Sequence, residues 1–365
     1  MNMKTGKIAL GFGSGRCTRY GQSLVRSRIQ ARSYRVWRRV VAEFLVMFQP
    51  RNTRNTRKNR KMRILCGINL IVAATLLAAA TVEAAEKARR FVLADESRPR
   101  IHYWDSADSN ACFSIQGERP MWDLKKVGDM RYRAVCKKGF KVFDLRERKV
   151  VDEFRHPSLD EVTAVCDMPD GGFVASVNPQ SGPDKGKVVM LRRFSAKREL
   201  VATYRCEGFF YARSLQWDRD GKTLLLSWEK GFARIRLPKE GDVCEVIGDF
   251  RQPKGRNLFD VVPSISGDGY VAGCGYRGGL VRFDKDGKAK SVWFVPEQDG
   301  CVSFFYAQTH EMPNGHVYMA HWTGHGASDS MKGWQVVEFD GEGRVVWHLH
   351  DPERFGSISG INVLP

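Results

Sequence analysis

Short apolar segments of alternating polarity repeat along the chain from residue 85 onward. The clearest copy runs from Trp334 to Leu349, where two apolar runs flank an Asp-Gly-Glu-Gly tetrapeptide. In its second run, every other residue is apolar and would point to one face of a strand, while the residues between would point to the opposite face. The apolar residues are Val345, Trp347 and Leu349. Because successive side chains of a strand point to opposite faces, this alternation around a glycine-rich turn predicts an antiparallel β-hairpin.

The hairpin recurs at a nearly regular interval. A second clear copy spans Val281 to Phe294, and four weaker copies precede it. Successive anchors, taken where the first strand of each copy ends, are 39, 51, 43, 46 and 56 residues apart. This spacing is close to the length of one four-stranded blade, so it predicts a β-propeller. The anchors are Trp104, Phe143, Phe194, Leu237, Phe283 and Phe339.

Glycine-containing turns repeat at a similar interval and support the same division of the chain into blades. The expected turn between the first two strands of a blade carries an Asp-Gly or Asn-Gly pair, and the glycines of these pairs are 50, 48 and 46 residues apart. Such pairs supply the positive φ that tight hairpins need. The pairs are Asp170-Gly171, Asp220-Gly221, Asp268-Gly269 and Asn314-Gly315.

The pattern predicts an all-β fold of six four-stranded blades, or seven if a long loop contains further strands. The first blade lacks its first strand, because Phe91 to Ala94 has the character of a second strand. We expect the C-terminal segment from Ser357 to Leu364 to supply it and close the ring, which removes an open sheet edge. The fourth blade is expected to end with a strand from Val243 to Phe250. Residues 85–365 form a single domain.

The net charge of +18 does not indicate nucleic-acid binding by this domain. Residues 1–61 contain 16 of the 59 Lys and Arg residues and one acidic residue, Glu43. Residues 85–365 contain 42 basic and 39 acidic residues, so counterion release cannot drive tight phosphate binding there. We interpret residues 1–61 as a basic extension that is disordered or lies upstream of a true start at Met62.

Residues 62–84 have the features of a secretory signal peptide. Met62-Arg63 forms a short positive region, residues 64–82 are apolar, and small residues precede a cleavage site between Ala84 and Ala85. The alternative is that residues 64–82 stay uncleaved as a membrane anchor, because this length is near the lower limit for a bilayer span. Both interpretations place the domain outside the cytoplasm, either secreted or periplasmic or anchored with the domain facing outward.

Seven cysteines follow the expected cleavage site, about one per blade and mostly within apolar runs. No Cys-x-x-Cys motif occurs, which argues against a zinc ribbon, a redox dithiol or haem attachment. In an oxidising compartment some cysteines could pair, although their odd number leaves at least one unpaired. For most of them, we favour burial as small hydrophobic residues.

The reactive side chains concentrate in the sixth blade, where four of the eight histidines lie within sixteen residues. Histidine and carboxylate groups in proximity could bind a metal or transfer protons, so we take this group as the candidate site. We favour the simpler interpretation, in which exposed histidines decorate loops and strand edges without any role, and therefore assign no catalytic or metal-ligand role. The catalytic candidates are His310, His321 and His325, and the metal-ligand candidates are His310, Glu311, His321, His325 and Asp329.

The blade segments Val337 to Trp347 and Val281 to Trp293 resemble repeats of secreted bacterial PQQ-like (quinoprotein-type) propellers and of bacterial arylsulfotransferases. The resemblance covers roughly Ala85 to Pro365 and implies an extracytoplasmic propeller with any ligand near the central axis. Quinoproteins usually have eight blades with dedicated PQQ and calcium ligands, which have no counterparts that we can place here. Arylsulfotransferases agree better in blade number and use histidine chemistry for sulfuryl transfer, but their active-site residues do not map onto this sequence.

We therefore expect a non-catalytic extracytoplasmic propeller, PQQ-like or WD40-like in its repeats, that binds a ligand, polymer or protein partner at its funnel. We expect a monomer without a cofactor or nucleic acid, with membrane contact only through an uncleaved 64–82 segment. The alternative is a propeller enzyme of the arylsulfotransferase or lyase type that uses the sixth-blade histidines. Fold likeness alone does not choose between these functions.

Overall fold

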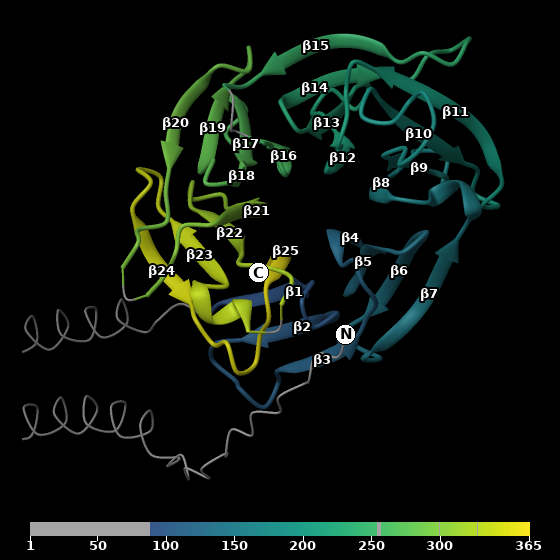
Figure 1. Cartoon of the computed structure of the whole chain (residues 1–365). Coiled ribbons are helices and arrows are strands. Elements are labelled where there is room, and N and C mark those ends of the chain that lie inside the picture. The colour runs from purple at the N-terminus through teal and green to yellow at the C-terminus, as the bar shows by residue number, and fades with distance from the viewer. Residues whose placement is uncertain (1–87, 254–256, 299, 327) are drawn as a thin grey trace, which may run out of the picture. The chain divides into compact units, whose positions relative to one another are not determined.

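The computed structural model describes residues 88–253, 257–298, 300–326 and 328–365. Within this part of the chain, six antiparallel sheets stand around a central axis as a β-propeller (Figure 1). The predictions of an all-β fold, of six blades and of four strands per blade are confirmed. The expected basic extension, signal peptide and cleavage site between Ala84 and Ala85 lie outside the described residues.

The strand next to the axis comes first in each blade, and the remaining strands follow outward. Blade 1 contains β25 (Ile358–Leu364), β1 (Arg90–Asp95), β2 (Arg100–Asp105) and β3 (Phe113–Gln116). Blade 2 contains β4 (Trp122–Gly128), β5 (Arg131–Cys136), β6 (Gly139–Asp144) and β7 (Lys149–Arg155). Blade 3 contains β8 (Val162–Asp167), β9 (Phe173–Val177), β10 (Val188–Phe194) and β11 (Leu200–Glu207).

The second half of the ring follows the same scheme. Blade 4 contains β12 (Ser214–Trp217), β13 (Leu224–Trp228), β14 (Gly231–Arg236) and β15 (Glu245–Arg251). Blade 5 contains β16 (Asp260–Pro263), β17 (Gly269–Gly273), β19 (Leu280–Asp284) and β20 (Ala289–Trp293). Blade 6 contains β21 (Phe305–Glu311), β22 (Val317–Trp322), β23 (Val336–Phe339) and β24 (Val345–Leu349).

The C-terminal strand closes the ring as predicted. β25 pairs antiparallel with β1, with Phe91 opposite Val363 and Leu93 opposite Ile361. Ile361 is almost fully buried in this position. The innermost strand of blade 1 therefore comes from the end of the chain, and the three strands that follow it come from the beginning of the domain.

The hydrophobic core lies between blades rather than at the centre of the ring. At the junction of blades 6 and 1, Phe91 stacks on Trp104 with ring centroids 5.4 Å apart and meets the edge of Tyr318 at 5.3 Å. Both faces of each sheet are thus covered by the neighbouring blades. This explains why several second strands, such as β9 and β13, are buried along their whole length.

The glycine-rich turns confirm the predicted phase with one correction. Gly171, Gly221 and Gly315 have positive φ values of 82°, 59° and 82°, as tight turns require. In blade 5 the equivalent turn ends two residues earlier than predicted, because the amide of Gly267, and not that of Gly269, closes it by donating to the carbonyl of Ser264. Gly269 instead begins β17, where a Cβ atom would lie 1.8 Å from the carbonyl oxygen of Phe283.

Three small elements were not predicted. β18 (Gly275–Tyr276) leaves blade 5 and pairs with the first residues of β21, which makes the sheet of blade 6 five-stranded. Two short 3₁₀ helices, η1 (Pro157–Leu159) and η2 (Asp329–Lys332), interrupt loops. No helix in the described residues is long and apolar enough to span a membrane.

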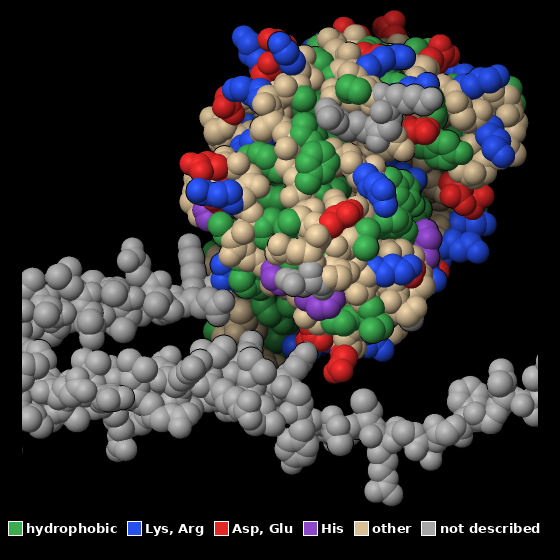
Figure 2. Space-filling view, turned by 60° about the vertical axis from the view of Figure 1, so that its left-hand side comes forward, with side chains coloured by type: hydrophobic (Ala, Val, Ile, Leu, Met, Phe, Trp, Pro, Cys, Tyr) green, Lys and Arg blue, Asp and Glu red, His purple; other side chains and the backbone are tan. Residues whose placement is uncertain are grey.

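Charged side chains of both signs alternate over the outer surface of the propeller. Figure 2 shows blue and red groups side by side on the face that comes forward in that view, with apolar groups between them. Many of these charges form exposed ion pairs, such as Arg146 with Asp129 and Lys149 with Glu147. The described surface therefore agrees with the near balance of charges counted in residues 85–365.

Candidate functional site

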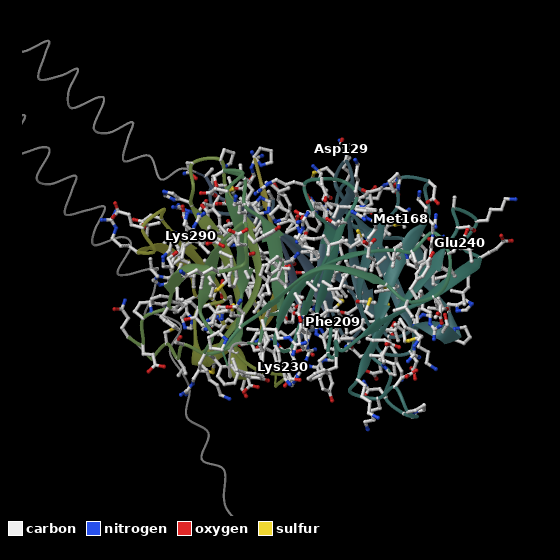
Figure 3. The ribbon with its side chains drawn as sticks, turned by 90° about the horizontal axis from the view of Figure 1, so that it is seen from above. Asp129, Met168, Phe209, Lys230, Glu240 and Lys290 are labelled. Carbon is white, nitrogen blue, oxygen red and sulfur yellow. The ribbon has the colours of Figure 1, made fainter. Side chains whose placement is uncertain are left out.

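The axis of the propeller has a cavity at each end. We call the side where the innermost strands begin the start face, and the side where they end the end face. Figure 3 shows Phe209 and Lys230 on the start face, with Asp129 and Met168 on the opposite, end face. The start-face cavity has a volume of about 300 Å³ and the end-face cavity about 420 Å³.

Polar side chains between these two cavities connect neighbouring innermost strands. Lys125 in β4 forms an ion pair with Asp123 at 3.0 Å and also donates to the carbonyl oxygens of Val165 and Leu215 in blades 3 and 4. Because this one ammonium group satisfies acceptors from three blades, it fixes their spacing around the axis.

Amide side chains continue the connection around the axis. Gln216 of β12 donates to the carbonyl of Val261 in blade 5. Gln308 of β21 donates to the carbonyl of Leu124 in blade 2 at 2.8 Å, and Asn362 of β25 donates to the same carbonyl at 3.0 Å. We call Asp123, Lys125, Gln216, Asp260, Gln308 and Asn362 the polar ring.

Asp260 joins blades 5 and 6 within the polar ring. Its carboxylate accepts hydrogen bonds from the amide of Thr309 at 3.1 Å and from the hydroxyl of Thr309 at 3.3 Å. Burial raises the pKa of Asp260 to about 6, because two bonds to one threonine do not replace its hydration. The polar ring thus contains a carboxyl group whose pKa lies well above the usual value for aspartate.

Aromatic side chains line the start-face cavity. Tyr276 meets Phe305 with ring centroids 4.7 Å apart, and Phe305 meets both Trp322 and Phe259 at 5.3 Å. Tyr276 is half exposed, whereas Phe259 and Trp322 are each 8% exposed. We call this cavity the aromatic mouth; its lining is Trp122, Arg213, Phe259, Tyr276, Phe305, Trp322 and His325, with Ala307 and Ser359.

Arg213 gives the aromatic mouth a positive charge. Its guanidinium lies over the ring of Trp122, 5.5 Å from the centroid. Burial lowers the pKa of Arg213, and the charges of Tyr276, Glu229 and Tyr211 oppose this by smaller amounts. Among the described residues, no carboxylate lies within ion-pair distance of this guanidinium, and no hydrogen bond from it is found. Its donors therefore remain available to a ligand.

Glu96 and His325 form a pair at the edge of the aromatic mouth. Nδ1 of His325 lies 3.1 Å from each carboxylate oxygen of Glu96. The Glu96 side chain is buried and also accepts a hydrogen bond from Nε1 of Trp322 at 3.2 Å, whereas the His325 side chain is 68% exposed. Arg119 donates to the carbonyl of His325 at 3.0 Å. Nδ1 therefore donates to the Glu96 carboxylate, and Nε2 is the ring nitrogen that does not face this carboxylate.

The predicted sixth-blade candidates do not meet at one point. His325 lines the aromatic mouth, and His310 lines the end-face cavity, where burial lowers its pKa. His321 is fully buried; its Nδ1 donates to the carbonyl of Trp334 at 2.9 Å, and its Nε2 accepts from the amide of Phe304 at 3.0 Å. Both ring nitrogens of His321 are therefore occupied in holding the backbone of blade 6.

The two predicted carboxylates have structural partners. Glu311 is buried, pairs with Arg282 at 2.7 Å and accepts from the amide of Ile265 at 2.6 Å, so it connects blades 5 and 6. Asp329 begins η2, accepts from the amide of Gly326 at 2.8 Å and pairs with Lys332 at 2.5 Å. Within the described ranges, no group of three or more His, Cys, Asp or Glu side chains is placed to hold a metal ion.

A larger cavity, of about 760 Å³, lies elsewhere, between blades 2 and 3. Its charged groups already pair with one another, as Arg133 does with Asp167 and Arg198 with Asp152. It is wide and mostly polar, so nothing in it distinguishes a ligand from solvent. We therefore place the candidate site at the aromatic mouth, where an arginine lacks an acidic partner.

No family model matches this sequence, and no curated protein matches it. The chain is similar to the crystal structure of a protein of unknown function from Bacteroides caccae, with a TM-score of 0.59 and 19% identity over 76% of this chain and 98% of that chain. It also aligns with the β-propeller domain of Cps50 (Swd1) from Myceliophteria thermophila, with a TM-score of 0.38 and 9% identity over 65% of this chain and 70% of that chain. These similarities concern the fold alone. The predicted resemblance to quinoproteins and arylsulfotransferases is supported only to the extent that the chain is a β-propeller.

Proposed function

We propose that this protein is an extracytoplasmic β-propeller that binds an organic anion with a flat, apolar body at the aromatic mouth. The main support is the environment of Arg213: its guanidinium is enclosed by aromatic rings and has no carboxylate partner among the described residues. A bound carboxylate or sulfate would accept two parallel hydrogen bonds from it.

The body of the ligand is defined by the rings around Arg213. Trp122, Phe305 and Tyr276 present faces and edges to the cavity, and such surfaces bind flat or apolar groups by area burial and offset stacking. A volume of about 300 Å³ fits a small ring compound or one ring of a longer chain. A charged group at one end and a ring at the other is therefore the ligand chemistry that fits best.

Calorimetric titration with a matched pair of probes tests this proposal. The full-length protein is titrated with 4-nitrophenyl sulfate and, separately, with 4-nitrophenol at a pH where the phenol is neutral. We expect the sulfate ester to bind and the uncharged phenol to bind at least about tenfold more weakly, which corresponds to the loss of one charge-assisted hydrogen bond.

The variant Arg213→Gln keeps a polar side chain but removes the charge, and should lower the affinity for the sulfate ester to that for the phenol. Arg236→Gln serves as a matched control, because Arg236 is an exposed arginine of blade 4 paired with Glu245. Equal affinities for the two probes, or unchanged binding by the Arg213 variant, would exclude this site.

A catalytic function is the second candidate, and the Glu96–His325 pair favours it. A buried carboxylate that orients Nδ1–H leaves the opposite nitrogen as a nucleophile or a base. In sulfuryl transfer, Nε2 would form a bond to sulfur while the bond from sulfur to the aryl oxygen breaks and the arylate leaves. A hydroxyl acceptor would then take the sulfuryl group and release its proton.

The same probe separates the two candidates. Turnover releases 4-nitrophenolate in the presence of a phenol acceptor, whereas simple binding releases none. For an enzyme, we expect His325→Asn to abolish release without weakening binding, and Glu96→Gln to reduce it. His310→Asn is the matched control on the other face. Binding without release leaves the non-catalytic function as the better one.

A further inference from the structure

Cys206 and Cys244 approach each other at the junction of blades 3 and 4. Cys206 lies near the end of β11, and Cys244 directly precedes β15. Their sulfur atoms are 2.9 Å apart, and both residues are buried. A movement of about 1 Å would bring the two atoms to the length of a disulfide bond.

The backbone, and not only the side-chain rotamers, holds this pair together. Arg205 forms a parallel bridge with Val243. The amide of Arg205 donates to the carbonyl of Asp242 at 2.6 Å, and the amide of Cys244 donates to the carbonyl of Arg205 at 2.9 Å. In a parallel pair, the residues that follow a bridged pair are neighbours with side chains on the same side. The register therefore places the two thiols next to each other.

Other cysteines direct their sulfur atoms to the backbone. Cys112, Cys166 and Cys301 each have a backbone carbonyl oxygen as the sulfur partner. This is the behaviour expected of small buried residues, which was the favoured interpretation for most cysteines. The Cys206–Cys244 pair differs because each sulfur has the other as its neighbour.

We propose that Cys206 and Cys244 form a disulfide bond when the protein folds in an oxidising compartment. The two thiols lose two protons and two electrons, one S–S bond forms, and the disulfide of a thiol oxidoreductase is reduced to its dithiol. The exchange takes place before blade 4 packs against blade 3, because the folded thiols are enclosed. Burial also raises the pKa of Cys206 well above its usual range, so the folded thiol is a poor nucleophile.

The bond would brace the aromatic mouth from the outside. The loop that it closes includes β12, β13 and β14 and the segment that carries Tyr211 and Arg213. Closing such a loop lowers the conformational entropy of the unfolded chain, and it also fixes the outer edge of blade 4 to blade 3. The inference shares the extracytoplasmic location with the proposed function but does not depend on the proposed ligand, because the thiols line neither axial cavity.

Peptide mapping of the full-length protein tests the bond. The protein is refolded in a mixture of reduced and oxidised glutathione, alkylated without reduction and digested. We expect the intact mass to fall by two hydrogens, and a peptide containing Cys206 to be joined to one containing Cys244. Alkylation of both residues in protein that has regained its native circular dichroism would overturn the proposal, as would a bond from either residue to another cysteine.

Thermal unfolding provides the second measurement. The variant with both Cys206→Ala and Cys244→Ala should unfold several degrees below the oxidised wild type, and a reducing agent should largely remove the difference. Cys136→Ala, a buried cysteine of blade 2, is the matched control and should respond to the reducing agent as the wild type does. If the variants do not fold, the mapping of the wild-type protein decides alone.

Discussion

Leu93 in β1 lies directly opposite Ile361 in β25, although the two residues come from opposite ends of the propeller's sequence. Both side chains are buried, and both pack in the hydrophobic cluster that also contains Phe91 and Phe355. The last seven-residue strand therefore joins the end of the chain to the first strands of the domain and closes the ring of six blades. The stability of the whole ring should depend on this one strand.

Shortening Ile361 to alanine should lower the free energy of unfolding by about 2–4 kcal/mol, because the deleted groups leave a cavity between blades 1 and 6. Urea unfolding followed by tryptophan fluorescence measures the effect. Val346→Ala is the control, since Val346 lies on β24 with 48% of its surface exposed and should change stability by less than about 0.5 kcal/mol. Equal losses in the two variants would contradict closure of the ring by β25.

Asp260 should make the protein less stable as the pH rises from about 4 to 6. Its folded pKa is raised to about 6 by burial, so the folded state binds a proton over a range in which the unfolded state has lost it. Stability from this group is present at low pH and is lost as the pH passes the folded pKa, at a cost of up to about 3 kcal/mol.

Asp260→Asn cannot titrate, so the difference in unfolding free energy between this variant and the wild type should itself change with pH. We expect the free energy of unfolding of the variant to rise relative to that of the wild type between about pH 4 and 6. Above that range the difference should be constant. Urea titrations at several pH values measure it. A difference that stays flat across the range would show that Asp260 ionises normally in the folded protein.

His321 should have the opposite effect on the pH dependence of stability, because it should make the protein less stable as the pH falls. Burial lowers its pKa to about 4, so the unfolded state binds a proton at pH values where the folded state does not. Stability from the neutral ring is therefore present above the unfolded pKa of His and is lost as the pH falls toward 4. His321→Gln should be less stable at pH 7, because it disturbs the bonds to Trp334 and Phe304, but its stability should fall less on acidification.

The positions of strands and the closure of the ring could be predicted because they depend on local patterns. Alternation near Val345 and the glycine turn at Gly315 are visible in a few consecutive residues. Errors occurred where a tertiary contact decides the local structure. Val243 was expected to begin the last strand of blade 4, but it pairs with Arg205 of blade 3 instead. β18 likewise exists only because β21 of the next blade offers an edge.

The candidate site was harder to predict, because its residues come from different blades. Trp122, Arg213 and Tyr276 are far apart in the sequence: Trp122 begins β4, Arg213 immediately precedes β12, and Tyr276 ends the two-residue β18. Four histidines close in sequence suggested a cluster. Residues of one blade that are close in sequence can nevertheless lie at opposite ends of the axis, as His310 and His325 do. A useful signal would have been an arginine immediately before a predicted innermost strand, as Arg213 is before β12.

The polar ring leads to a final prediction about Lys125. Replacing Lys125 with methionine keeps its apolar stem but leaves the buried carboxylate of Asp123 without its ion-pair partner, and leaves the carbonyls of Val165 and Leu215 without a donor. An unpaired buried charge is costly, so we expect a loss of about 3 kcal/mol in the free energy of unfolding.

Combining Lys125→Met with Asp123→Asn should restore part of this loss, because the neutral amide oxygen can still accept from the amide of Val165. Additive losses in the double variant would mean that the pair is not coupled. Lys149→Met is the matched control: its ion pair with Glu147 is exposed, so water replaces the partner and stability should hardly change. The contrast between the two lysines shows what enclosure at the axis, together with the bonds to two further blades, adds to an ion pair.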